Sequence, residues 1–433
     1  MVPNTALHVI DALNTGGAQE LLALLAKWAP PGRSMAVCVL QPRLDVKARL
    51  EANGVAVYPL NRPRPSIFSP FRFLAYIALN LRDIARLKKK LGADIVHCHL
   101  SDSEFLGILA GRAAGARKVS MTFHTPALLP ERPRADRRVL PRDRRDLRDR
   151  RDRPGRPGRR GWLEWLSDRR AWLNDRRGRL INRLRNRLRD RLRILTMRLI
   201  YRRADAVVAV SAQTRDALRD VVGIAPERLF HIPNGVDCDD LGSRTPPEAL
   251  RRELGLSPAD RVILNLGRLV PLKGQIYVIR ALAELAGTHP DLKLLIAGDG
   301  PEESALAGEI DRLGLGGRAF LLGARLDAPD LLAISDLVVG ASLWEGTSLA
   351  LMEAMAAGKP LAVSDIPGNR ELLTDGADAL MFAPADASSL AAAAGRLLSD
   401  PALAERLARA AQAKARETFD IRRVVAAYEA LWT

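Results

Sequence analysis

The sequence predicts an α/β protein made of two Rossmann-like, doubly wound domains that face each other across a cleft. Three observations support this fold class. The chain has 433 residues, which suits two domains of about 200 residues each. Short apolar runs alternate with longer amphipathic segments, as in parallel sheets whose strands are covered on both faces. The alternation occurs as two series, separated by IPNG at 232–235, which we interpret as a turn and a hinge.

The first series predicts the elements of an N-terminal domain at 1–235. Its expected strands are 7–11, 37–41, 55–60, 95–99, 118–123 and 206–211. Its expected helices are 18–28, 46–53, 71–91, 104–114 and 212–221. Each strand is a short apolar run that ends at a polar or glycine-containing turn, and each helix has apolar residues three or four positions apart.

The second series predicts a C-terminal domain at 236–415. Its expected strands are 262–266, 292–297, 320–322, 337–340 and 360–364. Its expected helices are 274–286, 301–313, 328–335, 348–357, 387–399 and 401–417. The amphipathic stretch 421–431 closes the chain, and we expect the segment 416–433 to cross back to the N-terminal domain.

The positive charge is confined to one segment. The whole chain carries a formal net charge of +17, but residues 131–203 alone contain 28 Arg and 10 acidic residues, a net charge of +18. The remainder has a net charge of −1, so the basic pI says nothing about the two domains themselves. Sparse cysteines without a CxxC pair, no apolar run of membrane-spanning length and no signal-peptide pattern lead us to expect a cytoplasmic protein.

The segment 127–200 interrupts the first series as an Arg-rich insertion. Residues 131–160 have too few apolar residues to pack, and we expect them to be disordered. Tryptophans and leucines appear from Trp162 onward, and from Leu180 to Leu195 apolar residues recur every three or four positions among arginines, which predicts a basic amphipathic helix over 162–200 with tryptophans at its entry. Three interpretations remain open: an anionic membrane surface, a solvated hairpin packed on the domain, or a nucleic-acid contact.

The strongest pattern of candidate site residues is EGTSLALMEAM at 345–355, which follows a predicted strand and opens a helix. We expect Thr347 or Ser348 to cap this helix through its hydroxyl, and the free N–H groups there to suit a phosphate. Glu345 lies in the loop and Glu353 in the helix. A carboxylate in such a position can accept two sugar hydroxyls, such as the 2′,3′ pair of ribose.

A second pattern, GRLVPLKG at 267–274, places two cations after another strand. Arg268 and Lys273 there can neutralise a diphosphate leaving group without a metal ion. The context of glycines at a strand end favours this role over that of ordinary surface charges.

Together with AGDGPE at 297–302, Gly16-Gly17 and IPNGVD at 232–237, these motifs resemble the family 4 glycosyltransferases of GT-B fold, also described as glycosyl transferases group 1. The Glu-x7-Glu motif of that family is matched by Glu345 and Glu353. The resemblance covers nearly the whole chain apart from about residues 127–195, where the Arg-rich insertion departs from the family pattern.

The resemblance implies a retaining transfer from a UDP- or GDP-linked sugar to a lipid-linked or polysaccharide acceptor in cell-envelope or exopolysaccharide synthesis. It implies no metal and no other cofactor, and a location in the cytoplasm or at the inner face of the cytoplasmic membrane. By the family pattern, Arg268 and Lys273 hold the diphosphate, Glu353 holds the ribose and Glu345 faces the donor sugar. The remaining donor-binding positions are Gly16, Gly17, Gly346, Thr347, Ser348 and Leu349, and His124 matches a histidine near the sugar and the acceptor.

Other functions compete with this interpretation. Two carboxylates also occur in glycosidases, but GRLVPLKG would then have no role. The sequence Gly298-Asp299-Gly300 is half of a dinucleotide fingerprint, for which a plain turn is the simpler interpretation. His97, His99 and His124 could ligate zinc, although no fourth ligand is evident. A sugar-nucleotide epimerase, a phosphorylase and an RNA-binding protein using the Arg-rich arm are the remaining alternatives.

Overall fold

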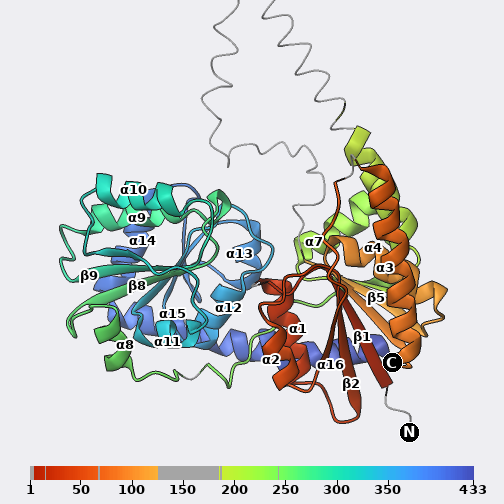
Figure 1. The fold of residues 1–433 in the computed structure, drawn as a ribbon. Helices are drawn as coiled ribbons and strands as arrows, with labels where there is room; N and C mark the ends of the chain where they lie inside the picture. Colours follow the sequence, from red (N-terminus) through yellow and green to blue (C-terminus); the bar gives the residue numbers. More distant parts are fainter. Residues whose placement is uncertain (1–3, 15, 67–68, 125–184, 186–187, 242) are drawn as a thin grey trace, which may run out of the picture.

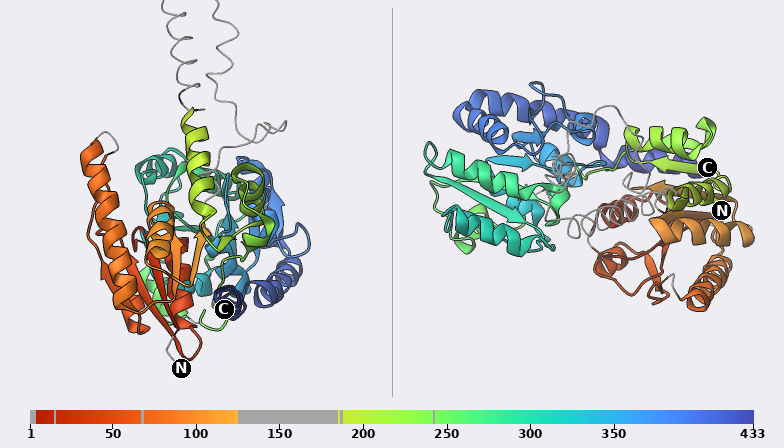
Figure 2. Two further views of the ribbon diagram at one scale, coloured as in Figure 1. Left: turned by 90° about the vertical axis from the view of Figure 1, so that its right-hand side faces the viewer. Right: turned by 90° about the horizontal axis from the view of Figure 1, so that it is seen from above.

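The computed structural model describes residues 4–14, 16–66, 69–124, 185, 188–241 and 243–433. It consists of two domains, each built around its own parallel sheet with helices on both faces (Figure 1). The two domains lie side by side, and the view from above separates the red-to-lime first domain from the green-to-blue second domain (Figure 2). The predicted fold class, two Rossmann-like, doubly wound domains, is confirmed.

The first sheet has seven parallel strands in the order β3-β2-β1-β4-β5-β6-β7. The strands are β1 (Asn4–Ile10), β2 (Arg33–Val39), β3 (Ala56–Pro59), β4 (Ile95–His99), β5 (Lys118–Phe123), β6 (Ala206–Ala209) and β7 (Leu229–His231). The helices are α1 (Gly17–Lys27), α2 (Lys47–Ala52), α3 (Pro70–Lys90), α4 (Ser101–Ala113) and α7 (Ala212–Ala217), with a π-helical turn at Leu218–Val222. Strands β4 and β5 match the predicted bounds residue for residue.

The second sheet has six parallel strands in the order β10-β9-β8-β11-β12-β13. The strands are β8 (Arg261–Leu266), β9 (Leu292–Ala297), β10 (Ala319–Leu321), β11 (Leu337–Gly340), β12 (Leu361–Ser364) and β13 (Leu380–Phe382). The helices are α8 (Pro247–Glu253), α9 (Gln275–Leu285), α10 (Glu303–Arg312), α11 (Ala328–Ile334), α12 (Leu349–Ala356), α13 (Pro367–Leu372), α14 (Ala387–Ser399) and α15 (Pro401–Lys414).

Four elements were missed by the sequence analysis, namely β7, α8, α13 and β13. Each has three to seven residues, too few for a periodicity of 2 or 3.6 to stand out. The predicted helix 401–417 is also longer than α15, because the chain widens into a π-helical turn at Ala415–Phe419. Asp386 and Asp400 are the N-cap residues of α14 and α15, and their carboxylates accept first-turn N–H bonds.

The last helix, α16 (Ile421–Trp432), leaves the second domain and packs under the first sheet, as the blue ribbon in Figure 1 shows. Its Tyr428 hydroxyl lies 2.8 Å from Thr122 Oγ1 on β5, and Trp432 Nε1 donates to Ser120 Oγ over 3.1 Å. Both aromatic rings are at most 2% exposed. Because α16 covers one face of the first sheet, the chain's last residues complete the core of its first domain.

The described part of the Arg-rich insertion is helical over 188–201. Met197 and Tyr201 on this helix are buried in the core of the first domain, whereas Leu188, Leu192, Leu195 and Leu199 are 52–60% exposed. The predicted disorder of 131–160 and the helix start near Trp162 lie outside the described residues. No described helix is long and apolar enough to cross a membrane.

Substituting Trp432 tests the role of α16. Trp432→Ala should lower the free energy of unfolding of the first domain by about 3–5 kcal/mol, because a buried indole and its hydrogen bond are lost. The measurement is urea denaturation followed by circular dichroism. Arg423→Ala, on the exposed side of the same helix, is the control and should change stability by less than about 0.5 kcal/mol. Equal effects of the two substitutions would contradict a supporting role for α16.

Candidate active site

The candidate site lies where the strand order reverses in each sheet. In the first sheet this point lies between β1 and β4, and in the second between β8 and β11. Crevices outside the carboxyl ends of strands at such points are the usual ligand sites of doubly wound folds. Gly16 and Gly17 follow β1, Arg268 and Lys273 follow β8, and Glu345 follows β11. The sequence-predicted donor residues therefore occupy the expected edge of each sheet.

The two domains approach each other at the N-termini of α1 and α12. A Cβ atom built on Gly17 would lie 3.6 Å from Leu349 Cδ1, so the first residues of the two helices are in van der Waals range. Neither helix receives a side-chain cap at its N-terminus from the described residues. Backbone N–H groups and the positive ends of two helix dipoles thus converge between the domains, which is favourable for an anion.

A cation and a carboxylate from the second domain pair beside these helix ends. Lys273 Nζ lies 2.6 Å from Glu345 Oε2, which also accepts a 3.1 Å hydrogen bond from Ser342 Oγ. The Lys273 and Glu345 side chains are 21% and 17% exposed, so the pair is only partly screened by water. Arg268 is exposed, and no described residue is paired with its guanidinium.

The prediction that a Thr347 or Ser348 hydroxyl caps α12 is wrong. Ser348 does occupy the N-cap position, but its side chain makes no capping hydrogen bond. The Thr347 hydroxyl instead accepts a 3.0 Å bond from Asn234 Nδ2, which comes from the hinge between the domains. Thr347 thus fixes the loop against the hinge.

Glu353 lies in the second turn of α12 and is largely enclosed. Burial raises its pKa to about 7, and the nearby negative charge of Glu20 adds to this shift while Arg49 opposes it. Glu20 and Arg49 belong to the first domain and form a bidentate pair at 2.6 and 2.8 Å. Glu353 therefore titrates near neutral pH.

His124 directly follows β5 at the carboxyl edge of the first sheet. Its Nε2 lies 3.2 Å from His99 Nδ1, and its surroundings lower its pKa to about 4. His97, which the zinc alternative required, bonds instead to Ser120 Oγ at 2.7 Å and Thr122 Oγ1 at 2.8 Å. Within the part of the chain that the structure describes, no group of three or more His, Cys, Asp or Glu could hold a metal ion.

Several residues that shape the site were missed by the sequence analysis. A Cβ on Gly368 would lie 2.3 Å from the carbonyl oxygen of Glu345, so this glycine lets α13 support the Glu345 loop. Gly298, which was interpreted as a turn, would place a Cβ 2.0 Å from Gly267 O and so allows two loops to touch. Asp11 directly follows β1 and accepts the Ser103 N–H at 2.7 Å, and burial raises its pKa to about 6. The position of Asp11 directly after a buried strand could have identified it as a candidate site residue.

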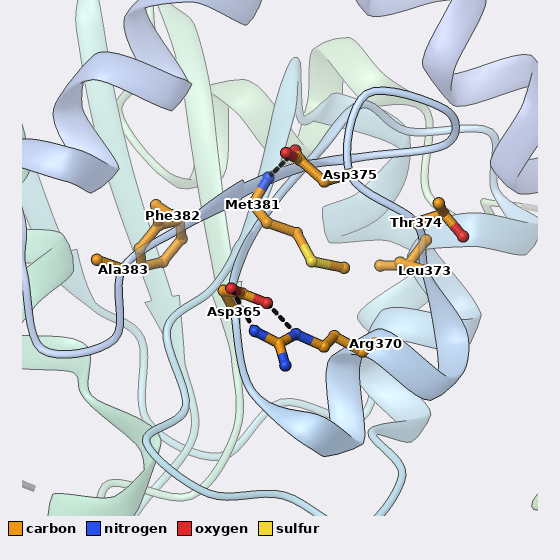
Figure 3. A pocket seen from close by; sticks show the side chains of 8 residues that line it. All are labelled: Asp365, Arg370, Leu373, Thr374, Asp375, Met381, Phe382 and Ala383. Atoms are coloured by element: carbon orange, nitrogen blue, oxygen red, sulfur yellow. Dashed lines mark hydrogen bonds and ion pairs between the residues drawn. The ribbon is translucent and has the colours of Figure 1, made fainter. Parts of the chain in front are cut away.

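A separate hollow of about 520 Å³ lies at the outer edge of the second sheet (Figure 3). Asp365 and Arg370 form an ion pair at its wall, and Met381 lies beside them. None of the sequence-predicted site residues lines it. We therefore place the candidate site at the helix ends between the domains, where charge and backbone donors converge, and not in this separate hollow.

Two family models together match most of the chain. A family model described as "Glycosyltransferase Family 4" matches residues 15–240, and one described as "Glycosyl transferases group 1" matches residues 247–414. The glycogen synthase of Mycobacterium tuberculosis is 35% identical over 231 residues, which are 53% of this chain and 54% of the relative. The chain thus spans about half the length of that relative.

Two further proteins extend the comparison. The lipopolysaccharide core biosynthesis mannosyltransferase LpsB of Rhizobium meliloti is 31% identical over 246 residues, which are 54% of this chain and 68% of the relative. The crystal structure of Anabaena Alr3699/HepE in complex with UDP and glucose aligns with a TM-score of 0.72 and 22% identity over 98% of both chains. At that identity the structural likeness supports the fold alone.

Proposed function

The chain belongs to glycosyltransferase family 4, and we propose that it transfers a sugar from a nucleoside diphosphate sugar to a saccharide acceptor with retention of configuration. One observation carries this proposal. The uncapped N-termini of α1 and α12 meet between the domains, beside the Lys273–Glu345 pair. Converging N–H donors and cations fit a diphosphate.

When a diphosphate binds, the Lys273 ammonium would exchange its ion pair with Glu345 for one with phosphate. In the structure Lys273 neutralises the Glu345 carboxylate at 2.6 Å. A diphosphate in the cleft offers more negative charge to the same ammonium, and Arg268 has no described partner to give up. Lys273 then contacts phosphate, and Glu345 is free to accept hydroxyl hydrogen bonds from the donor sugar. The two side-chain cations supply the charge that a metal ion supplies in other transferases.

Transfer follows the front-side course that the family resemblance implies. The bond between C1 of the sugar and the diphosphate oxygen breaks, and the acceptor oxygen bonds to C1 on the same face. The acceptor proton passes to an oxygen of the leaving phosphate. Arg268, Lys273 and the first-turn N–H groups stabilise the charge that develops on that phosphate. His124, neutral near pH 7 because its pKa is about 4, contacts the sugar without carrying charge.

The comparisons suggest the first substrates to test. The Anabaena protein was crystallised with UDP and glucose, and LpsB is named for lipopolysaccharide core synthesis. We therefore propose a UDP- or GDP-sugar as donor and a lipid-linked or polysaccharide acceptor of the cell envelope. Incubating the protein with UDP-sugars and no acceptor separates this function from the epimerase alternative, which would yield an isomerised sugar nucleotide.

Removing the Lys273 ammonium tests the phosphate site. Lys273→Ala should lower kcat/KM for the donor at least about 100-fold, because a charge that stabilises the leaving group is lost. Lys293→Ala is the matched control, since Lys293 lies at the amino end of β9 and bonds to Gly317 O. EDTA should leave wild-type activity unchanged. A Lys273→Ala enzyme within threefold of wild type would overturn the assignment.

The pKa of Glu353 predicts a pH dependence of donor binding. The carboxylate accepts two ribose hydroxyls best when ionised, and its pKa of about 7 means that ionisation grows as the pH rises from about 6 to 8. The dissociation constant of a UDP-sugar should therefore fall roughly tenfold over this range, as measured by titration calorimetry. Glu353→Gln should bind weakly at every pH, whereas Glu303→Gln, an exposed acid on α10, should behave as wild type. A pH-dependent Glu353→Gln variant would argue against the ribose contact.

We also propose that the enzyme works at the inner face of the cytoplasmic membrane, where the helix over 188–201 contacts anionic lipid. Its exposed leucines, at positions 188, 192, 195 and 199, follow the spacing of one helix face, and Arg189 and Arg191 beside them are exposed. Vesicle flotation should show binding to anionic but not neutral lipid, weakened by salt. The double variant Leu192→Asn/Leu195→Asn should bind less, and Leu326→Asn, on an 89% exposed leucine of the second domain, should not. Equal binding to neutral vesicles would refute lipid recognition.

A further inference from the structure

Three histidine rings of the first domain form one hydrogen-bonded line that ends at His124, directly past the carboxyl end of β5. His8 lies on β1, His99 on β4 and His124 directly after β5. His8 Nδ1 is 3.0 Å from His99 Nε2, and His99 Nδ1 is 3.2 Å from His124 Nε2. His99 thus uses both ring nitrogens to bridge the other two rings. His8 and His99 have no exposed surface, whereas His124 is partly exposed.

The sheet register creates this line. His8 and Ile10 on β1 pair with His97 and His99 on β4, so these histidines point to the same face of the sheet. That face is covered by α16, whose Trp432 ring lies 5.5 Å from the His8 ring. The rings are therefore sealed from water on the side away from the cleft.

All three rings are neutral in the folded protein near pH 7. Burial lowers the pKa of His8 to about 3 and that of His124 to about 4, and it holds the pKa of His99 well below its usual value. A neutral imidazole carries one N–H donor and one acceptor nitrogen. Two arrangements of the protons are therefore possible. In one, both hydrogen bonds donate from His8 towards His124, and in the other both donate from His124 towards His8.

The buried end of the line selects between the two directions. His8 Nε2 is buried and has no partner among the described residues. If the bonds ran from His124 towards His8, this nitrogen would carry a buried N–H without an acceptor, and orphaned buried N–H groups are rarer in proteins than under-satisfied acceptors. The bonds therefore run outward. His8 Nδ1–H donates to His99 Nε2, and His99 Nδ1–H donates to His124 Nε2.

We propose that His8 and His99 are positioning residues that hold His124 with its proton on Nδ1, so that this N–H donates to a hydroxyl oxygen of the sugar in the cleft. The identity of the sugar rests on the proposed transferase function, but the proton position does not. A ring with the opposite tautomer would present a lone pair at Nδ1 and would accept from the hydroxyl instead. The line thus decides the polarity of the contact between His124 and its substrate.

The backbone next to His99 supports a functional role for this line. Leu100 has a φ of 72° and a ψ of 170°, a region that residues with a side chain seldom adopt. Such strain persists only where the surrounding structure enforces it, and it occurs mostly at functional sites. The Ser103 hydroxyl donates to the carbonyl oxygen of His99 and holds the same backbone.

Nitrogen-15 NMR of the full chain labelled on histidine tests the proposal without any substrate. Long-range proton–nitrogen correlations distinguish the two neutral tautomers. Wild-type His124 should be the Nδ1–H form near pH 7. In His99→Leu it should shift to the Nε2–H form or a mixture, because Nε2 has lost its donor. His99→Gln should preserve the wild-type form, since the glutamine amide can accept from His8 and donate to His124. His289→Gln, in the second domain and bonded to Arg261, is the control.

Steady-state kinetics of the same variants provide a second measurement. With a donor that the wild type accepts, His99→Leu should lower kcat about tenfold and leave the donor KM within threefold, and His99→Gln should recover most of the loss. If His99→Leu does not fold, His8→Leu takes its place. It removes the donor to His99 Nε2 and should give a mixture of the two His124 tautomers. An Nε2–H form of His124 in the wild type, or an unchanged tautomer in the folded leucine variants, overturns the proposal. Absence of transfer with a Nδ1–H His124 would instead count against the proposed function.

Discussion

The approach of the two domains at Gly17 and Leu349 is the contact on which the site depends. Either sheet alone offers one helix N-terminus and its loops. The crossing of α16 under the first sheet and the bond from Asn234 to Thr347 hold the carboxyl ends of both sheets face to face. The uncapped end of α1 then meets that of α12, and Lys273 lines a small pocket together with Ser348, the N-cap residue of α12. An anion there meets donors from both domains, which explains why the site needs two domains.

Much of the fold could be predicted because its strands are buried on both faces. The run IVHCH at 95–99 stands out against polar turns, and its ends matched the structure. Other strand ends shifted by several residues: the strand predicted at 37–41 lies at Arg33–Val39. The elements that were missed are short, and periodicity has no meaning over three residues such as Leu380–Phe382. The Thr347 hydroxyl could not be placed by local pattern, because its partner Asn234 is 113 residues away in sequence.

The sequence predicted where the candidate site lies, but not which of its side chains contact one another. Parallel strands bring their carboxyl ends to one edge, so the motifs after β8 and β11 had to lie near each other. The pairing of Lys273 with Glu345 and the effect of the Glu20 and Arg49 charges on the pKa of Glu353 depend on loop and domain geometry. Alternation placed His97 and His99 on one face, but their different partners come from the register of β1, β4 and β5. That register is a tertiary property.

Hydrogen–deuterium exchange with and without a sugar nucleotide tests the central claim most directly, namely that the donor diphosphate binds between the helix ends. A panel of UDP-, GDP- and ADP-sugars covers the base. With the nucleotide that binds, slowed exchange should appear together in the first turns of α1 and α12 and in the loop from Gly267 to Gly274. Residues 365–383, around the separate hollow at the edge of the second sheet, should exchange as before. Protection confined to that hollow, or to one domain alone, would contradict the account.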